Sequence, residues 1–325
     1  MKHWIEAARL RTLPLSVSGI ILGSFYAMSE SIFNWKIVLS ALATTLLLQI
    51  LSNFANDYGD GIKGTDNNER IGPKRAIQSG TISPQAMKRA LYLTSVLTMF
   101  AAVTLIYFSF KDSNLIYTLV FLTLGALAIA SAIRYTVGNT AYGYRGYGDV
   151  FVFVFFGLVS TLGVSFMILK EIDPLLVLPA TAIGFLSVGV LNLNNMRDEV
   201  SDRKAGKNTL VVKIGGEKAK IYHYFLVVSA MVLFVVFTII FDFSKDNDPE
   251  HFNFDLYFFL LIYIPLLKHL GRVRKATEPR MLDPELKKLA ISTFLISTIL
   301  ALSLIYFFSD IIVQIVNATS NQINQ

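Results

Sequence analysis

The chain has 325 residues, of which 54% are hydrophobic and only 16% are charged. A soluble protein usually carries about 25% charged residues, so this composition argues against a soluble enzyme and against a disordered chain. It predicts a protein that crosses a membrane several times. The sequence contains no cysteine, which excludes disulfides, thiolate nucleophiles and iron–sulfur ligation.

Nine segments are apolar over most of the length needed to cross the hydrocarbon core, which takes roughly 20 residues. Eight of them are clear, whereas residues 256–267 are apolar but short. In chain order the predicted spans are residues 12–29, 37–56, 90–110, 113–133, 150–169, 174–196, 221–241, 256–267 and 289–309. We therefore expect an all-α, polytopic membrane protein. Its nine transmembrane helices form a single domain over residues 1–325, with a polar tail at residues 317–325.

The distribution of Lys and Arg supports nine spans and sets their orientation. With nine spans, most of these residues fall on one side, and the other side keeps only Lys36, Lys111, Lys170 and Lys245. Without the short span, the positive charges of residues 268–288 would lie on the wrong side. Because cytoplasmic loops are enriched in Lys and Arg, we expect the N-terminus on the cytoplasmic side of the membrane and the C-terminus on the other side.

Acidic residues gather at the ends of the second and sixth predicted spans. Each end carries two asparagines and two aspartates: Asn53, Asn56, Asp57 and Asp60 in the second span, and Asn194, Asn195, Asp198 and Asp202 in the sixth. Residues three or four apart share one face of a helix, so the acids of each set project together. The two spans are four apart in order, which indicates two pseudo-repeats with motifs near residues 53–66 and 194–202.

This pattern of oxygen ligands points to a site for a phosphorylated substrate. Close carboxylates repel each other, and ionised groups near hydrocarbon are costly to desolvate. A hard divalent cation such as Mg²⁺ offsets both effects, because it takes oxygen ligands and also binds phosphate oxygens. The alternative is that the acids only balance the basic loops and cap helix ends. Two matched motifs on one side favour the diphosphate site.

Gly59, Gly61 and Gly64 match the spacing of a dinucleotide-binding fingerprint. That motif requires a strand before it and a helix after it, whereas a membrane helix precedes it here. We therefore reject the nucleotide interpretation. We expect these glycines to let the chain turn and approach phosphate closely.

The two aspartate motifs resemble those of the UbiA superfamily of intramembrane prenyltransferases, and the resemblance covers nearly the whole chain. Many members carry a third acid four residues after the second, where this chain has Gly64; the next acid is Asp66. Other stretches resemble the branch that prenylates 1,4-dihydroxy-2-naphthoate: residues 8–14, 53–64, 70–73, 142–149, 194–202 and 206–210.

The resemblance implies Mg²⁺-dependent transfer of a polyprenyl group from polyprenyl diphosphate to 1,4-dihydroxy-2-naphthoate, with loss of diphosphate and CO₂, in menaquinone biosynthesis. It also implies a prenyl tail that lies between helices open to the lipid bilayer. Another aromatic acceptor, such as 4-hydroxybenzoate, remains open. A secondary transporter is less favoured, because transporter sites lie near the bilayer midplane and these acids lie at span ends. No nucleic-acid partner and no obligate protein partner is expected.

Position relative to the motifs then assigns roles to individual residues. The expected catalytic and metal ligands are Asp57, Asp60, Asp198 and Asp202, with Asp66 as a further metal ligand. The expected substrate-binding residues are polar or aromatic and lie on the same side: Arg11, Asn53, Asn56, Lys63, Lys74, Arg75, Arg134, Tyr135, Tyr144, Arg145, Asn194, Asn195 and Lys207. The Phe-rich residues 151–156 are interpreted instead as lipid or helix packing.

Overall fold

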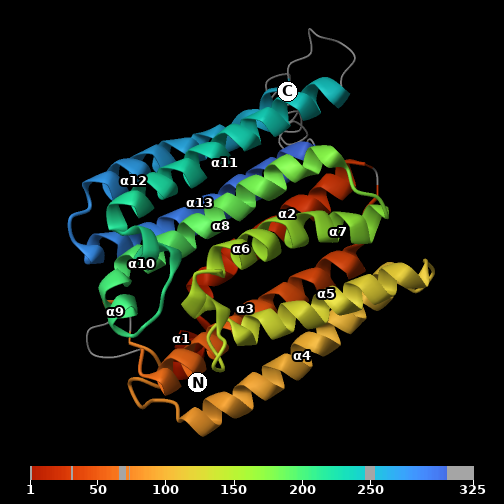
Figure 1. Ribbon diagram of the computed structural model, residues 1–325. Coiled ribbons are helices and arrows are strands. Elements are labelled where there is room, and N and C mark those ends of the chain that lie inside the picture. Colours follow the sequence, from red (N-terminus) through yellow and green to blue (C-terminus); the bar gives the residue numbers. More distant parts are fainter. Residues whose placement is uncertain (1, 31, 66–70, 73, 246–252, 306–325) are drawn as a thin grey trace, which may run out of the picture.

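The computed structural model describes residues 2–30, 32–65, 71–72, 74–245 and 253–305. Over these residues the chain is helical, and its long helices lie side by side in one bundle (Figure 1). Eight helical stretches are long and apolar enough to cross a membrane. A ninth span is reached if the bent pair α1 (Lys2–Ala8) and α2 (Leu13–Ser29) counts as one. The all-α membrane architecture is confirmed, with nine as an approximate count.

The long helices follow the predicted spans. After α2 they are α3 (Trp35–Lys63), α4 (Pro84–Phe110), α5 (Leu115–Arg134), α6 (Gly148–Val152) continued by η3 (Phe153–Val159) and α7 (Ser160–Leu169), α8 (Val177–Arg197), α11 (Gly216–Lys245), α12 (Tyr263–Lys275) and α13 (Asp283–Leu304). The bundle has two edges, with α4 and α5 at one and α11 and α12 at the other (Figure 1). None of the α5 residues is buried, which suits an apolar helix that faces lipid.

The short eighth span is completed by a change of helix type. A 3₁₀ helix, η5 (Phe254–Ile262), precedes α12, and together they cover 22 residues. A 3₁₀ helix rises about 2.0 Å per residue, more than an α-helix, so fewer residues are needed to cover the same thickness. The weak apolar signal of this segment therefore still produces a full span.

The two helices that carry the aspartate motifs lie in different parts of the bundle. Helix α3 packs against α2, α4 and α5, whereas α8 packs against α11, α13 and η3. Helix α3 ends at Gly64, whose φ of +69° is a left-handed helix cap. Short helices α1, α9 (Glu199–Lys204) and α10 (Leu210–Ile214) gather at the same end of the bundle (Figure 1). Both motifs thus reach one end of the molecule.

Gly59 and Gly61 do not form a turn, since both lie inside α3. A Cβ at Gly59 would lie 2.7 Å from the backbone of Thr136, so this glycine allows α3 to approach the chain that follows α5. Of the three glycines of the rejected fingerprint, only Gly64 turns the chain, as expected. For Gly59 the expected approach to phosphate is replaced by helix packing.

Candidate active site

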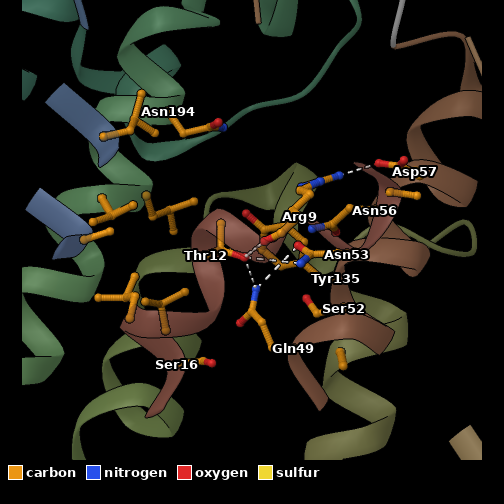
Figure 2. Close-up of a pocket in the computed structure, with 18 of the residues that line it drawn as sticks. Arg9, Thr12, Ser16, Gln49, Ser52, Asn53, Asn56, Asp57, Tyr135 and Asn194 are labelled. Carbon is orange, nitrogen blue, oxygen red and sulfur yellow. Dashed lines mark hydrogen bonds and ion pairs between the residues drawn. The ribbon is translucent and has the colours of Figure 1, made fainter. Parts of the chain in front are cut away.

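A cavity of about 930 Å³ lies where the motif-bearing ends of α3 and α8 meet α1, α2, η3 and α13 (Figure 2). Along α3 its wall runs from Asp60 at the helix end to Thr45, which is roughly 20 Å deeper at 1.5 Å per residue. The deeper wall is largely apolar and includes Leu15 and Leu48. The cavity therefore combines a charged end with an apolar extension into the membrane-spanning region.

On the α3 side, the buried Asp57 carboxylate is neutralised by two guanidinium groups. Arg75 Nη1 lies 3.1 Å from Asp57 Oδ1, and Arg9 Nη2 contacts the same oxygen. Arg9 occupies a left-handed backbone position between α1 and α2, which places its side chain at the cavity (Figure 2). A buried carboxylate is tolerated when cations compensate it in this way.

Asn53 holds the bend between helices α1 and α2, where Arg9 lies. Its amide nitrogen donates to the Ala8 carbonyl at 2.9 Å and to Thr12 Oγ1 at 3.3 Å, and Gln49 Nε2 donates to Thr12 Oγ1 at 3.1 Å (Figure 2). The first motif therefore does two things. Its aspartates face the cavity, and its first asparagine ties α3 to the start of α2.

On the α8 side, Arg197 stands between the cavity and Asp198. Its guanidinium donates to both Asp198 oxygens at 2.9 and 2.8 Å, to Asp283 Oδ1 at 2.5 Å and to Asn194 Oδ1 at 2.9 Å. Arg197 is only 2% exposed and lines the cavity, whereas Asp198 lies behind it. A Cβ at Gly72 would lie 2.7 Å from Arg197 Nη2, so the loop after α3 covers this ion cluster.

Lys207 joins the two motifs. Its Nζ lies 3.8 Å from Asp60 Oδ2 and 3.8 Å from Asp202 Oδ1. Burial lowers the pKa of Lys207, but the two carboxylates outweigh burial and hold it above its usual value, so the ammonium stays charged. Residues that are far apart in sequence thus meet around one cation that lines the cavity.

Tyrosines border this charged end. Tyr144 donates its hydroxyl proton to Asp60 Oδ1 at 2.8 Å, and Lys63 Nζ lies 4.0 Å from the centroid of its ring. Burial, and then Asp60, raise the pKa of Tyr144, and burial raises the pKa of Tyr135 to about 12. Both phenols are therefore neutral near pH 7, so they act as hydrogen-bond donors and aromatic surfaces.

The oxygen-rich lining fits a hard divalent cation in composition. Asp57, Asp60 and Asn56 line the cavity, and Asn56 Oδ1 is a buried oxygen without a hydrogen-bond partner among the described residues. Within the same described part of the chain, no group of three or more His, Cys, Asp or Glu side chains is arranged to hold an ion. Basic side chains contact the motif carboxylates instead, so a cation would bind together with phosphate oxygens.

The structure brings most of the expected residues to one place. Nine line the cavity: Asn53, Asn56, Asp57, Asp60, Lys74, Arg75, Tyr135, Asn194 and Lys207. Four contact lining residues or each other at its border: Lys63, Tyr144, Asp198 and Asp202. Asn195 is buried outside the lining, and Arg134 and Arg145 are exposed outside it. Asp66 and the side chain of Arg11 lie outside the described part of the structure.

Sequence reasoning missed three kinds of residue. Arg9 and Arg197 are absent from the predicted site residues, although a cation directly beside an acidic helix end could have marked Arg197. Asp283 begins α13, far along the chain from either motif, and no local pattern indicated it. The interpretation of residues 151–156 as packing is wrong for Phe151, Phe155 and Phe156, which line the cavity.

Known proteins resemble this chain in sequence and in fold. Residues 16–245 match the model of the UbiA prenyltransferase family. The chain is 47% identical to a 1,4-dihydroxy-2-naphthoate octaprenyltransferase of Escherichia coli strain K12 over 73% of this chain and 76% of that one. It is 40% identical to the enzyme of that name from Haemophilus influenzae over 94% and 96%. A UbiA homolog from Aeropyrum pernix K1 shares the fold, with a TM-score of 0.63 and 13% identity over 86% of this chain and 94% of that one. This chain is therefore an integral membrane prenyltransferase of the UbiA family.

Proposed function

We propose that the protein transfers a polyprenyl group from polyprenyl diphosphate to 1,4-dihydroxy-2-naphthoate, with loss of diphosphate and CO₂, as a step of menaquinone biosynthesis. The relatives that carry this activity in their names support the acceptor. The observation that carries the proposal is the position of Lys207 between Asp60 and Asp202. It unites two acidic helix ends at the mouth of one cavity that continues into an apolar channel.

At the charged end, basic side chains bind the diphosphate. Lys74, Arg75 and Lys207 line the cavity and carry fixed positive charge toward it. Such groups stabilise the negative charge that develops on a departing diphosphate. Asp57 and Asp60 line the cavity and would hold Mg²⁺, which when bound neutralises phosphate charge and favours departure of the leaving group. Asp198 and Asp202, expected as further ligands, lie behind Arg197 and Lys207 and hold these cations toward the diphosphate.

Next to the diphosphate site, an aromatic side chain of the cavity stabilises the positive charge on the reacting carbon. Departure of diphosphate leaves positive charge on the allylic carbon, and an aromatic face stabilises a nearby cation. The neutral ring of Tyr135 lines the cavity close to Lys207 and serves this role. The naphthoate ring attacks through the carbon that bears its carboxylate, the carboxylate leaves as CO₂, and the product is a demethylmenaquinol.

We place the charged end of the cavity on the cytoplasmic side of a bacterial inner membrane. The support is the concentration of Lys and Arg in the loops at this end, as the positive-inside rule requires. In this orientation the soluble acceptor enters the site from the cytoplasm, and the prenyl tail enters it from the lipid bilayer. The two pseudo-repeats supply one motif each to this single site.

The direct test is an acceptor assay with membranes that contain the protein. We expect prenylation of 1,4-dihydroxy-2-naphthoate with release of diphosphate, and loss of activity when EDTA removes divalent cations. Prenylation of 4-hydroxybenzoate but not of 1,4-dihydroxy-2-naphthoate would refute the acceptor. Activity that persists in EDTA would refute the metal requirement while leaving the acceptor intact.

A further inference from the structure

A π-helical segment, η3, interrupts the fifth span between α6 and α7 and forms part of the cavity wall. Phe151 and Ser160 lie on either side of it and both line the cavity. In a continuous α-helix of about 3.6 residues per turn these positions would be two and a half turns apart, on opposite faces. The wider π turns bring them back to the same side. Such segments are rare and frequently occur at functional sites.

Close contacts with two neighbouring helices hold this segment in place. A Cβ at Gly157 would lie 2.6 Å from the Ala180 carbonyl oxygen and 2.7 Å from the Gly184 Cα, so η3 touches the backbone of α8. At the C-terminal end of η3, where α7 begins, a Cβ at Gly19 of α2 would lie 2.0 Å from Ser160 Oγ. The segment cannot rotate without displacing a neighbouring helix. The side chains that it turns toward the cavity are therefore fixed in position.

Four aromatic rings form a continuous series along this wall, and all four line the cavity. The centroids of Tyr135 and Tyr142 lie 5.3 Å apart, those of Tyr142 and Phe151 lie 4.0 Å apart in a stacked pair, and those of Phe151 and Phe155 lie 6.3 Å apart. We name these four residues the aromatic wall. Tyr135, beside the charged end (Figure 2), begins it, and Phe155 of η3 ends it.

We propose that the aromatic wall binds the first isoprene units of the prenyl donor, and that Phe155 is a specificity-determining residue that favours donors with short tails. This inference rests on the proposed prenyl transfer. The wall starts where the diphosphate leaves and runs in the direction that the tail must take. It offers a rigid apolar surface to the carbons nearest the reacting bond.

The preference for short tails follows from where each donor comes from. Burial of apolar surface is favourable when that surface leaves water, by about 25 cal/mol per Å². A long prenyl tail already lies in the bilayer, where lipid chains are as apolar as the side chains of a protein. Moving the tail from lipid onto the aromatic wall therefore adds little binding free energy. A short donor such as geranyl diphosphate arrives from water, and the wall supplies most of the apolar burial that it gains.

A competition experiment tests this inference. The protein is reconstituted in liposomes with geranyl and octaprenyl diphosphates together, and the two prenylated products are quantified by mass spectrometry. Their ratio reports the ratio of the two kcat/KM values. Wild type should use both donors, and Phe155→Ala should lower the geranyl-to-octaprenyl ratio roughly tenfold, the lower range for loss of an apolar contact in a pocket. Phe155→Leu should shift the ratio less, in the same direction.

The matched control is Phe100→Ala, which removes the same ring from α4, where Phe100 is 72% exposed and lies outside the cavity lining. It should leave the ratio unchanged. An equal loss with both donors in the Phe155 variants would show a structural role and overturn the inference, as would a wild type that rejects geranyl diphosphate. The ratio is measured with whichever aromatic acceptor is prenylated, so an error in the proposed acceptor would appear separately.

Discussion

The two aspartate motifs look equivalent in sequence but occupy different environments in the structure. Asp57 and Asp60 at the end of α3 line the cavity directly. Asp198, which caps α8, and Asp202 of α9 lie behind Arg197 and Lys207, which line the cavity in their place. The first motif therefore presents carboxylate oxygens to a ligand, whereas the second presents cations held by carboxylates.

This difference suggests a division of labour within a single site. The α3 side is equipped to hold a metal ion, and the α8 side, in the arrangement described here, is equipped to hold phosphate oxygens. Arg197 and Lys207 would remain charged beside the diphosphate because their aspartates compensate them from behind. A repeated motif thus yields two complementary halves, because side chains from outside the motifs decide which charge faces the cavity.

The largest expected effect concerns the carboxylates themselves. Asp57→Asn and Asp198→Asn should each lower kcat on the order of a hundredfold or more, comparable to the loss of one preorganised transition-state contact. The measurement is prenyl transfer in membranes, normalised to the amount of folded protein. Asp112→Asn is the matched control, because the Asp112 side chain is 85% exposed at a loop beyond α4. A fully active variant at either motif would remove that motif from the site.

The next prediction compares how much stability the protein loses when the arginine beside each motif is removed. Arg197→Ala leaves Asp198 and Asp283 without the guanidinium that joins them, and breaking a buried ion pair costs about 3–5 kcal/mol. Arg9→Ala should cost less, about 1–2 kcal/mol, because Asp57 keeps Arg75. Thermal unfolding of the solubilised protein measures the order. Equal losses for the two variants would contradict the difference between the motifs.

A smaller effect concerns the loop that covers the second motif. In Gly72→Ala the new methyl group meets the Arg197 guanidinium, which two carboxylates hold in place. Overpacking of this kind costs about 1–3 kcal/mol, and we expect a matching loss of activity as Arg197 shifts. Gly271→Ala on α12 is the control, since its Cβ meets nothing within 4 Å. If the two variants have the same melting temperature and activity, Gly72 does not press on Arg197.

The smallest effect is in the pH dependence of stability. The pKa of Lys207 is raised in the folded protein, so its contribution to stability is fully present below the unfolded lysine pKa of about 10.4. That contribution should be lost only as pH rises from there through the folded value. The difference in unfolding free energy between wild type and Lys207→Met should therefore stay constant from pH 7 to 10. A difference that shrinks within this range would contradict the raised pKa.

The sequence was sufficient for the all-α membrane architecture and for an approximate number of spans, because hydropathy is a local signal. It placed Asp57, Asp60, Asn56 and Lys207 near one site, where the structure also brings them. It could not assign Arg197 its position between Asp198 and the cavity, because that position depends on Asp283 of a distant helix.

The cavity-lining role of residues 151–156 could not be predicted from the sequence either. Their composition is that of a lipid-facing helix, whereas Phe151 of α6 and Phe155 and Phe156 of η3 line the cavity, and η3 has a π-helical register. Contacts with α8 and α2 stabilise that register, and those contacts involve glycines far away in sequence. Helix type at this position is therefore a property of the packed bundle, which no local pattern specifies.

In the proposed mechanism the two motifs form one site, and a double-mutant cycle measures whether they act together. The affinity for inorganic diphosphate in the presence of Mg²⁺ is measured for wild type, Asp57→Asn, Asp198→Asn and the double variant. We predict a coupling free energy of at least about 0.5 kcal/mol, as is usual for residues in one network, with the double variant losing less than the sum of the single losses. Additive losses would mean that the two motifs bind diphosphate independently, and would contradict a single shared site.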